Sequence, residues 1–254
     1  MALYSFAINN ICYPSFHHND AAKTKARIFY EAIMIQPYST SSGKQVVYAA
    51  MDRKCAFHLA GYATAICLGN KQKQLPAVYF KIVLRQQGFQ KTNKLVFRPD
   101  KNGAIVEGGR LIQNLPLAFG DAAQYFSWVQ LEQYRCAFEA DVINLLVGYL
   151  AETKFVAMEE DVVFNPHLVN LGALHFYDGN SDFDVVSEYM SCFMPHKHER
   201  EQKLAELFLA AYAFVDNSAN WQAIVALADF IAIVGKDSIS CEEVMAVIES
   251  VLAA

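Results

Sequence analysis

Hydrophobic and polar positions alternate through much of the first half of the chain. The two-residue period of residues 3–13 predicts a half-buried strand, which ends at Pro14. Residues 21–35 instead repeat apolar side chains every three to four positions, which predicts a helix capped by Asp20. The further segments that favour strands are residues 45–50, 55–59, 62–68, 77–85, 94–98 and 104–106.

The period of three to four residues becomes dominant beyond Pro116. It predicts a helical region from Asp121, as its cap, to about Ala151, interrupted once near Cys136. Residues 154–164 and 168–177 look β-like, and the acidic loop 178–184 follows them. Helical patterns then continue from Asp184, the expected cap, with Pro195 as the first position of a helix.

A helical hairpin is the clearest prediction for the C-terminal region. One apolar stripe runs through residues 204–211 and another through residues 221–228. Gly235 fits a helix stop, and Ser240 with Glu243 has the spacing of a capping box for a last helix.

These patterns predict an α+β fold. Residues 1–116 are expected to form a basic α+β region, mainly an antiparallel sheet with one helix. Residues 117–254 are expected to form an acidic, mostly helical region. No flexible linker separates the two, so a single shared core is the alternative to two domains.

Composition favours a folded intracellular protein. The chain is 54% hydrophobic and 19% charged, with 18 Phe and 13 Tyr, whereas a disordered chain has more charge and fewer aromatic residues. No signal peptide is apparent, and the late apolar stretch 223–234 is too short to span a bilayer. The six cysteines are scattered without a CxxC pair, as is typical of a reducing compartment. We therefore expect a cytoplasmic protein with no membrane contact.

Charge is distributed very unevenly along the chain. Residues 1–110 hold 15 Lys or Arg against 5 Asp or Glu, whereas residues 111–254 hold 6 against 21. Such an asymmetry indicates contact with nucleic acid through the basic half. The opposite charges would equally allow the two halves to dock on each other, either within one chain or between chains.

A cation–aromatic strand supports the nucleic-acid interpretation. Tyr79, Lys81, Val83 and Arg85 would share one face of the strand 77–85. An aromatic ring among cations can stack on a base while the cations bind phosphates. The candidate nucleic-acid-binding residues are Lys71, Lys73, Tyr79, Lys81, Arg85, Phe89, Lys91, Lys94 and Arg110.

Two weaker patterns suggest metal chemistry. Cys192, His196 and His198 are close enough in sequence to share zinc, but a second ligand pair is missing. The other set is Asp141, Glu152 and Lys154. An acid followed by E-x-K resembles the core of metal-dependent nucleases, where carboxylates hold magnesium. That core needs the Glu and Lys on a strand, whereas the preceding residues 142–150 have a helical pattern.

The leading hypothesis is a non-catalytic subunit that contacts the backbone of DNA or RNA. Its acidic helical half would bind a protein partner or a second copy, and no cofactor is expected. The first alternative is an assembly protein with charge-complementary halves and no nucleic acid. The second is a metal-dependent nuclease or phosphodiesterase. The sequence has no Walker loop, GxGxxG or GxSxG motif that would favour another enzyme class.

Overall fold

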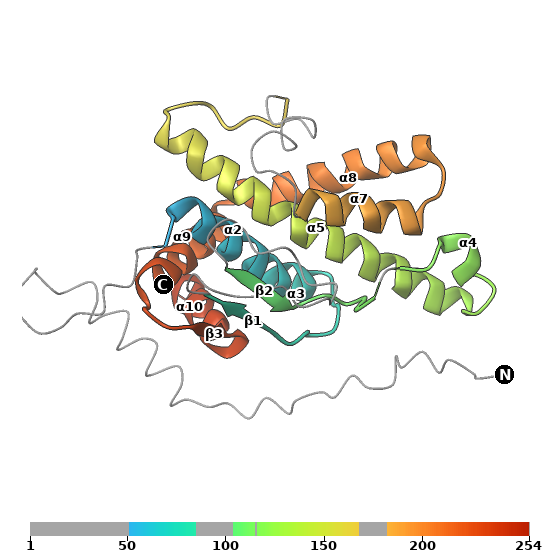
Figure 1. Ribbon diagram of the computed structural model, residues 1–254, viewed down its shortest axis with the longest axis horizontal. Helices are drawn as coiled ribbons and strands as arrows, with labels where there is room; N and C mark the ends of the chain where they lie inside the picture. The colour runs from blue at the N-terminus through green and yellow to red at the C-terminus, as the bar shows by residue number, and fades with distance from the viewer. Residues whose placement is uncertain (1–50, 85–103, 115, 168–181, 254) are drawn as a thin grey trace, which may run out of the picture.

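The computed structural model describes residues 51–84, 104–114, 116–167 and 182–253. Within these ranges the chain is mostly helical and carries one small sheet (Figure 1). The elements in chain order are α2 (Arg53–Thr64), the π-helix η2 (Ala65–Gly69), α3 (Asn70–Gln72), β1 (Phe80–Val83), β2 (Ile105–Gly108), α4 (Phe119–Ala122), α5 (Trp128–Glu159), α7 (Asp182–Phe193), α8 (Lys197–Asp216), α9 (Ser218–Ile233), β3 (Ser238–Ser240) and α10 (Cys241–Leu252).

The long helix α5 is the axis of the molecule, and α2, α7 and α8 pack against it (Figure 1). A capping box starts it, because the Ser127 hydroxyl accepts the Gln130 N–H and the Gln130 side chain accepts the Ser127 N–H. Every residue from 140 to 151 is buried, so this stretch has neighbours on all sides. The predicted cap at Asp121 and the break near Cys136 are therefore wrong. The strand predicted for 154–164 is also wrong over residues 154–159, which continue the helix.

Helix α2 replaces two of the predicted strands. Residues 55–59 and 62–68 are all helical, the latter divided between α2 and η2, and Asp52 caps α2 by accepting the Lys54 N–H at 3.1 Å. Nearly every side chain of this segment is buried, so no polar face reveals the helical period. In a short buried segment, sequence pattern alone cannot distinguish a strand from a helix.

Helices α2 and α5 approach each other closely at glycine. A Cβ built on Gly61 would lie 2.5 Å from the Ala151 Cβ and 2.8 Å from the Val147 carbonyl oxygen. Gly148 of α5 adds a second small residue to the same crossing. The missing side chains let the two backbones pack directly, which fixes where α2 sits on the long helix.

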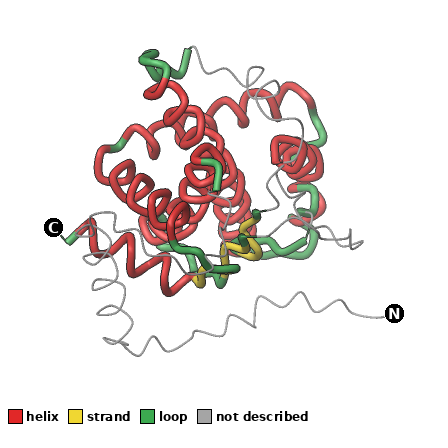
Figure 2. The backbone as a smooth tube through the Cα atoms, turned by 60° about the vertical axis from the view of Figure 1, so that its left-hand side comes forward, coloured by secondary structure: helices red, strands yellow, loops and turns green. Residues whose placement is uncertain are grey.

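The sheet is antiparallel, as predicted, but small. Its strand order is β2-β1-β3, with Ile82 opposite Val106 on one side and Ile239 on the other. These three side chains are buried, and the sheet lies beside the helices (Figure 2). The outer strand β3 was not predicted, because three residues are too few to show a period. Five predicted elements lie outside the described residues, namely those at residues 3–13, 21–35, 45–50, 94–98 and 168–177.

The C-terminal helices confirm the predicted hairpin. Asn217 ends α8 and caps α9 by accepting the N–H groups of Ala219 and Asn220. Gly235 follows α9 with a φ of 58°, and Ser240 with Glu243 forms the predicted capping box of α10. Two starts differ from the prediction. His196, not Pro195, directly precedes α8, and Asp184 lies inside α7 instead of capping it.

One hydrophobic cluster takes side chains from both sides of residue 116. Phe57 and Ile82 belong to it, as do Leu146 and Val247. Across the described residues, no helix combines the length and apolar character needed to cross a membrane.

A left-handed aspartate ends α5 and gives the first testable prediction. Asp161 has a φ of 56°, and the Val162 N–H donates to the Ala157 carbonyl, as in a Schellman motif. We expect Asp161→Gly to raise the free energy of unfolding by about 1 kcal/mol, because glycine adopts this backbone without steric cost. Urea denaturation measures the change. Glu160→Gly is the control, because its φ of −92° suits any residue, and it should give no gain.

Candidate functional site

Three of the predicted nucleic-acid-binding residues are exposed in the segment that leads from α3 to β1. Lys71 lies within α3, and Lys73 caps the C-terminal end of that helix, before a turn where Gln74 has a φ of 56°. Tyr79 immediately precedes β1, and 68% of its surface is exposed. An exposed ring of this kind has its flat surface open to solvent, where a planar partner can stack on it, as it also can on the exposed rings of Tyr125 and Trp128.

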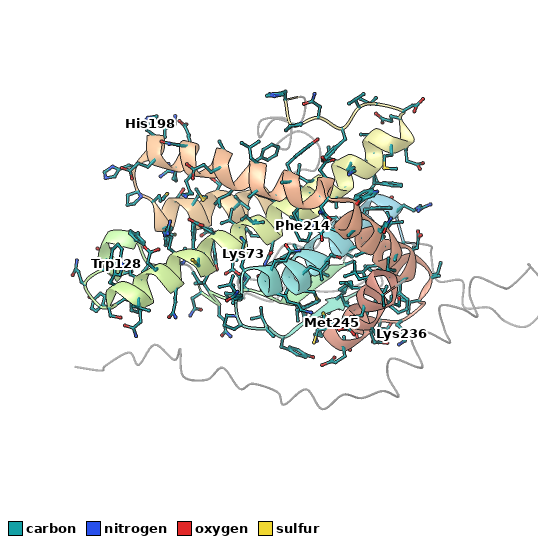
Figure 3. The ribbon with its side chains drawn as sticks, turned by 180° about the vertical axis from the view of Figure 1, so that it is seen from behind. Lys73, Trp128, His198, Phe214, Lys236 and Met245 are labelled. Carbon is teal, nitrogen blue, oxygen red and sulfur yellow. The ribbon has the colours of Figure 1, made fainter. Side chains whose placement is uncertain are left out.

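Lys73 lies next to the long helix α5, near Glu139 and Cys136 (Figure 3). Partial burial lowers the pKa of its ammonium group, whereas Glu139 and Cys136 nearby raise it. The side chain is nevertheless exposed overall, so its stem reaches solvent while its charged end leans toward Glu139. Lys73 is thus a partly buried lysine with a lowered pKa and the Glu139 carboxylate close to it.

Lys81 is already paired with an acid. Its Nζ atom lies 2.9 Å from a carboxylate oxygen of Glu107, the residue directly opposite on β2. Phe80 and Ile82 turn to the core while Lys81 is half-exposed, so the predicted alternation of the strand is confirmed over its described part. Lys81→Glu would place two carboxylates opposite each other across the strands, and such a variant would damage the sheet as well as any binding face.

Arg110 turns toward the interior. Its guanidinium lies 5.7 Å from the centre of the Tyr189 ring and close enough to Asp141 to lower the pKa of that carboxyl. It belongs to a polar anchor that sequence analysis missed. We use the name loop anchor for Arg110, Asp141 and Tyr189, because they hold the segment that follows β2.

Asp141 is the centre of the loop anchor. Its two carboxylate oxygens accept the backbone N–H groups of Leu111 at 2.8 Å and Ile112 at 2.9 Å. Only 1% of its surface is exposed, and this burial raises the pKa of the carboxyl to about 7, although both hydrogen bonds and Arg110 lower it. Both oxygens therefore bind backbone, and the carboxyl group serves to position the loop.

Tyrosines complete the hold on this segment. The Tyr189 hydroxyl donates to the Ile112 carbonyl, and the Tyr134 hydroxyl accepts the Leu117 N–H at 2.6 Å. Burial raises the pKa of both phenols, so they stay neutral donors. Two left-handed glycines, Gly108 and Gly109, turn the chain from β2 into the anchor.

The other predicted catalytic residues point to separate neighbours. Glu152 lies three turns along α5 from Asp141, about 16 Å further on, and faces His58 at 3.4 Å. The Lys154 ammonium donates to the Val215 carbonyl at 3.1 Å, at the end of α8. Asp141, Glu152 and Lys154 are on a helix, not on strands, and the structure does not bring them together.

The predicted zinc ligands are spread over two helices. Cys192 is half-buried near the end of α7, whereas His196 and His198 are exposed at the start of α8. Figure 3 shows His198 and Trp128 at one end of the long axis and Lys236 at the other. In the part of the chain that the structure describes, no three His, Cys, Asp or Glu side chains are grouped to hold a metal.

Four predicted contact residues lie outside the described residues. They are Arg85, Phe89, Lys91 and Lys94. The acidic loop 178–184 is likewise described only from Asp182, which starts α7.

Known proteins do not identify the chain. No family model, no curated protein and no solved structure matches it. The function has to be argued from the residues themselves.

Proposed function

We propose that the protein is a non-catalytic subunit that contacts a nucleic-acid backbone and also binds a protein partner. The observation that carries the first part is the exposed Tyr79, which follows the exposed cations Lys71 and Lys73 in one surface segment. A planar ring stacks on any base, and nearby ammonium groups bind phosphates, which together give binding without sequence preference.

The amino-acid composition of the β1–β2 connection also supports nucleic-acid contact. Residues 85–103 hold five Lys or Arg and one Asp. Because Val83 pairs with Ile105, the two ends of this basic segment start from neighbouring points of the sheet. Phosphate backbones carry a dense negative charge, so a sequence of this composition favours association with them.

The geometry of the candidate catalytic residues favours a binding role. Both oxygens of Asp141 accept backbone N–H groups, and Lys154 donates to a helix-end carbonyl. A general base or metal ligand needs a lone pair directed at substrate or metal. The anchor positions a loop, which is a structural task.

Charge reversal on the exposed turn tests the proposal. We expect Lys71→Glu combined with Lys73→Glu to weaken binding to single-stranded DNA or RNA at least tenfold. The slope of log K against log salt should fall by about 1 to 2. Fluorescence anisotropy over a salt series measures both quantities.

A matched control separates local contact from overall charge. Lys197→Glu combined with Lys236→Glu makes the same total change in net charge at two exposed sites in the acidic half. It should leave the affinity within about twofold of the unmodified protein. Equal losses from the two double variants, or no binding by the unmodified protein at low salt, would refute nucleic-acid contact by this face.

A further inference from the structure

An exposed apolar surface lies where the end of α5 meets α8. We use the name α5–α8 patch for Met158, Val162, Val163 and Leu209, together with the ring pair Phe164 and Tyr212. Val163 has 73% of its surface exposed, and Leu209 has 57%. Scattered exposed apolar residues are ordinary, whereas grouped ones mark interaction surfaces.

Specific contacts make the patch a single surface. The helices α5 and α8 run side by side in the same direction, because Glu139 meets Lys203 and Lys154 meets Val215. Beyond α5 the chain turns back over α8, where Phe164 stacks on Tyr212 with ring centres 4.7 Å apart. The Tyr212 hydroxyl also donates to the Phe164 carbonyl at 3.0 Å.

These contacts fix both parts of the patch relative to each other. Leu209 lies one turn before Tyr212 and therefore on the same side of α8. Val162 and Val163 directly precede Phe164 in the returning segment. The side chains thus come from two segments that the ring pair holds next to each other.

The rim of the patch is acidic. Glu159, Glu160 and Asp161 are exposed between Met158 and Val162, and Asp216 is exposed at the end of α8. The chain contains no Lys or Arg between Lys154 and Lys197. A partner for this surface must therefore supply both apolar side chains and positive charge.

Two described cations near this end of α5 are already engaged: Lys154 is largely buried, and Arg53, 5.3 Å from the Phe155 ring centre, pairs with Asp229. The Lys154 ammonium lies 4.7 Å from the Trp221 ring centre and 5.4 Å from that of Phe164, besides its bond to Val215. Only 14% of the Lys154 side chain is exposed. It stabilises the carbonyl end of α8 and lies 3.6 Å from a carboxylate oxygen of Asp216, whereas Glu159, Glu160 and Asp161 of the rim face solvent.

We propose that the α5–α8 patch binds a basic amphipathic helix of a partner protein. Leucine- or isoleucine-type residues on one helix face would cover the valines and Leu209, and flanking lysines or arginines would pair with the acidic rim. Nucleic acid and anionic lipid headgroups are repelled by the same carboxylates. This inference rests on the partner-binding part of the proposed function and is independent of nucleic-acid contact.

A designed peptide is the direct probe. A labelled Leu–Lys amphipathic peptide about five turns long should bind the full-length protein with micromolar affinity that falls with salt. A Leu–Glu peptide of the same pattern should not bind, and a scrambled Leu–Lys peptide should bind at least tenfold more weakly. Equal binding of the Leu–Glu peptide would overturn the proposal.

Paired variants locate the binding surface. Leu209→Gln with Val163→Gln should weaken peptide binding at least tenfold without changing the net charge. Leu252→Gln with Ile233→Gln removes two apolar side chains that are exposed elsewhere and should change little. Glu159→Gln with Glu160→Gln should reduce the salt dependence, whereas Glu199→Gln with Glu201→Gln should not. Indistinguishable patch and control variants would refute the site.

Two further measurements separate the remaining outcomes. Sedimentation velocity of the protein alone tests whether a second copy of the chain covers the patch. We expect no self-association through the patch. Self-association that Leu209→Gln abolishes would identify a second copy as the occupant and overturn the proposal. Nucleic-acid binding by the patch variants should equal that of the unmodified protein. If only the Lys71 and Lys73 charge reversal failed to weaken nucleic-acid binding, nucleic-acid contact would be refuted and peptide binding by the patch would not. If only the peptide failed to bind, the patch proposal would be refuted and nucleic-acid contact would not.

Discussion

We expect Asp141→Ala to lower the free energy of unfolding by about 3 to 5 kcal/mol near pH 5. The substitution leaves the N–H groups of Leu111 and Ile112 buried without an acceptor, and each such group costs about 1 to 3 kcal/mol. It also leaves a cavity between α5 and the loop. Urea denaturation measures the loss, and Asp121→Ala, at an exposed site on α4, should stay within about 0.5 kcal/mol.

The loss should shrink as pH rises. Burial raises the pKa of Asp141 to about 7 in the folded protein, against about 3.9 in an unfolded chain. Between these values the folded state binds more protons than the unfolded state, so the free energy of unfolding falls with increasing pH. The shift limits this change to about 4 kcal/mol between about pH 4 and pH 7, and only the unmodified protein undergoes it.

Asp141→Asn isolates that pH dependence. The amide cannot ionise, so the difference in unfolding free energy between the unmodified protein and this variant should be largest below about pH 4 and smallest above about pH 7. Other titrating groups are common to both proteins and cancel. A difference that is constant, or that grows with pH, would show that Asp141 is not a buried carboxyl with a raised pKa.

Gly61→Ala should destabilise the protein by about 2 to 3 kcal/mol, although alanine is the better helix former. The new methyl group would lie 2.5 Å from the Ala151 Cβ and 2.8 Å from the Val147 carbonyl oxygen, so α2 must shift on α5. Overpacking of this kind costs more than the roughly 1 kcal/mol gained from helix propensity. Thermal and urea unfolding measure the net effect.

The same change at another helical glycine should have the opposite sign. A Cβ on Gly120, in α4, would meet nothing within 4 Å, so Gly120→Ala should be neutral or stabilise by up to about 1 kcal/mol. Combining Gly61→Ala with Ala151→Gly removes one of the two close contacts and should recover part of the loss. If Gly61→Ala were as benign as Gly120→Ala, the close crossing of α2 and α5 would be wrong.

The parts of the fold that sequence predicts are those with a visible period or a specific cap. The capping box at Ser240 and the stop at Gly235 depend only on neighbouring residues, and both are found. The strand β1 is also predictable from the sequence, because its buried residues Phe80 and Ile82 alternate with half-exposed ones. Helix α2 is not predictable in this way, because it is buried on nearly every side and has few polar positions to mark a helical period.

The features of the candidate site likewise differ in how far the sequence predicts them. The alternation of the strand predicts that Tyr79 and Lys81 share a face, and the structure agrees, because Tyr79 is exposed and Lys81 half-exposed. Pairing of Lys81 with Glu107 depends on the register of two strands, which local sequence does not determine. The loop anchor joins three distant segments, and its one visible signal is an aspartate within an otherwise apolar helical run, next to Val142.

The position of β3 has a consequence for synthesis of the protein. The central strand β1 pairs with β2 on one edge and with β3, almost at the end of the described chain, on the other. A growing chain therefore presents one unpaired edge of β1 until Ser240 has left the ribosome. Open strand edges recruit other strands, so slow or interrupted translation should favour aggregation of the nascent protein.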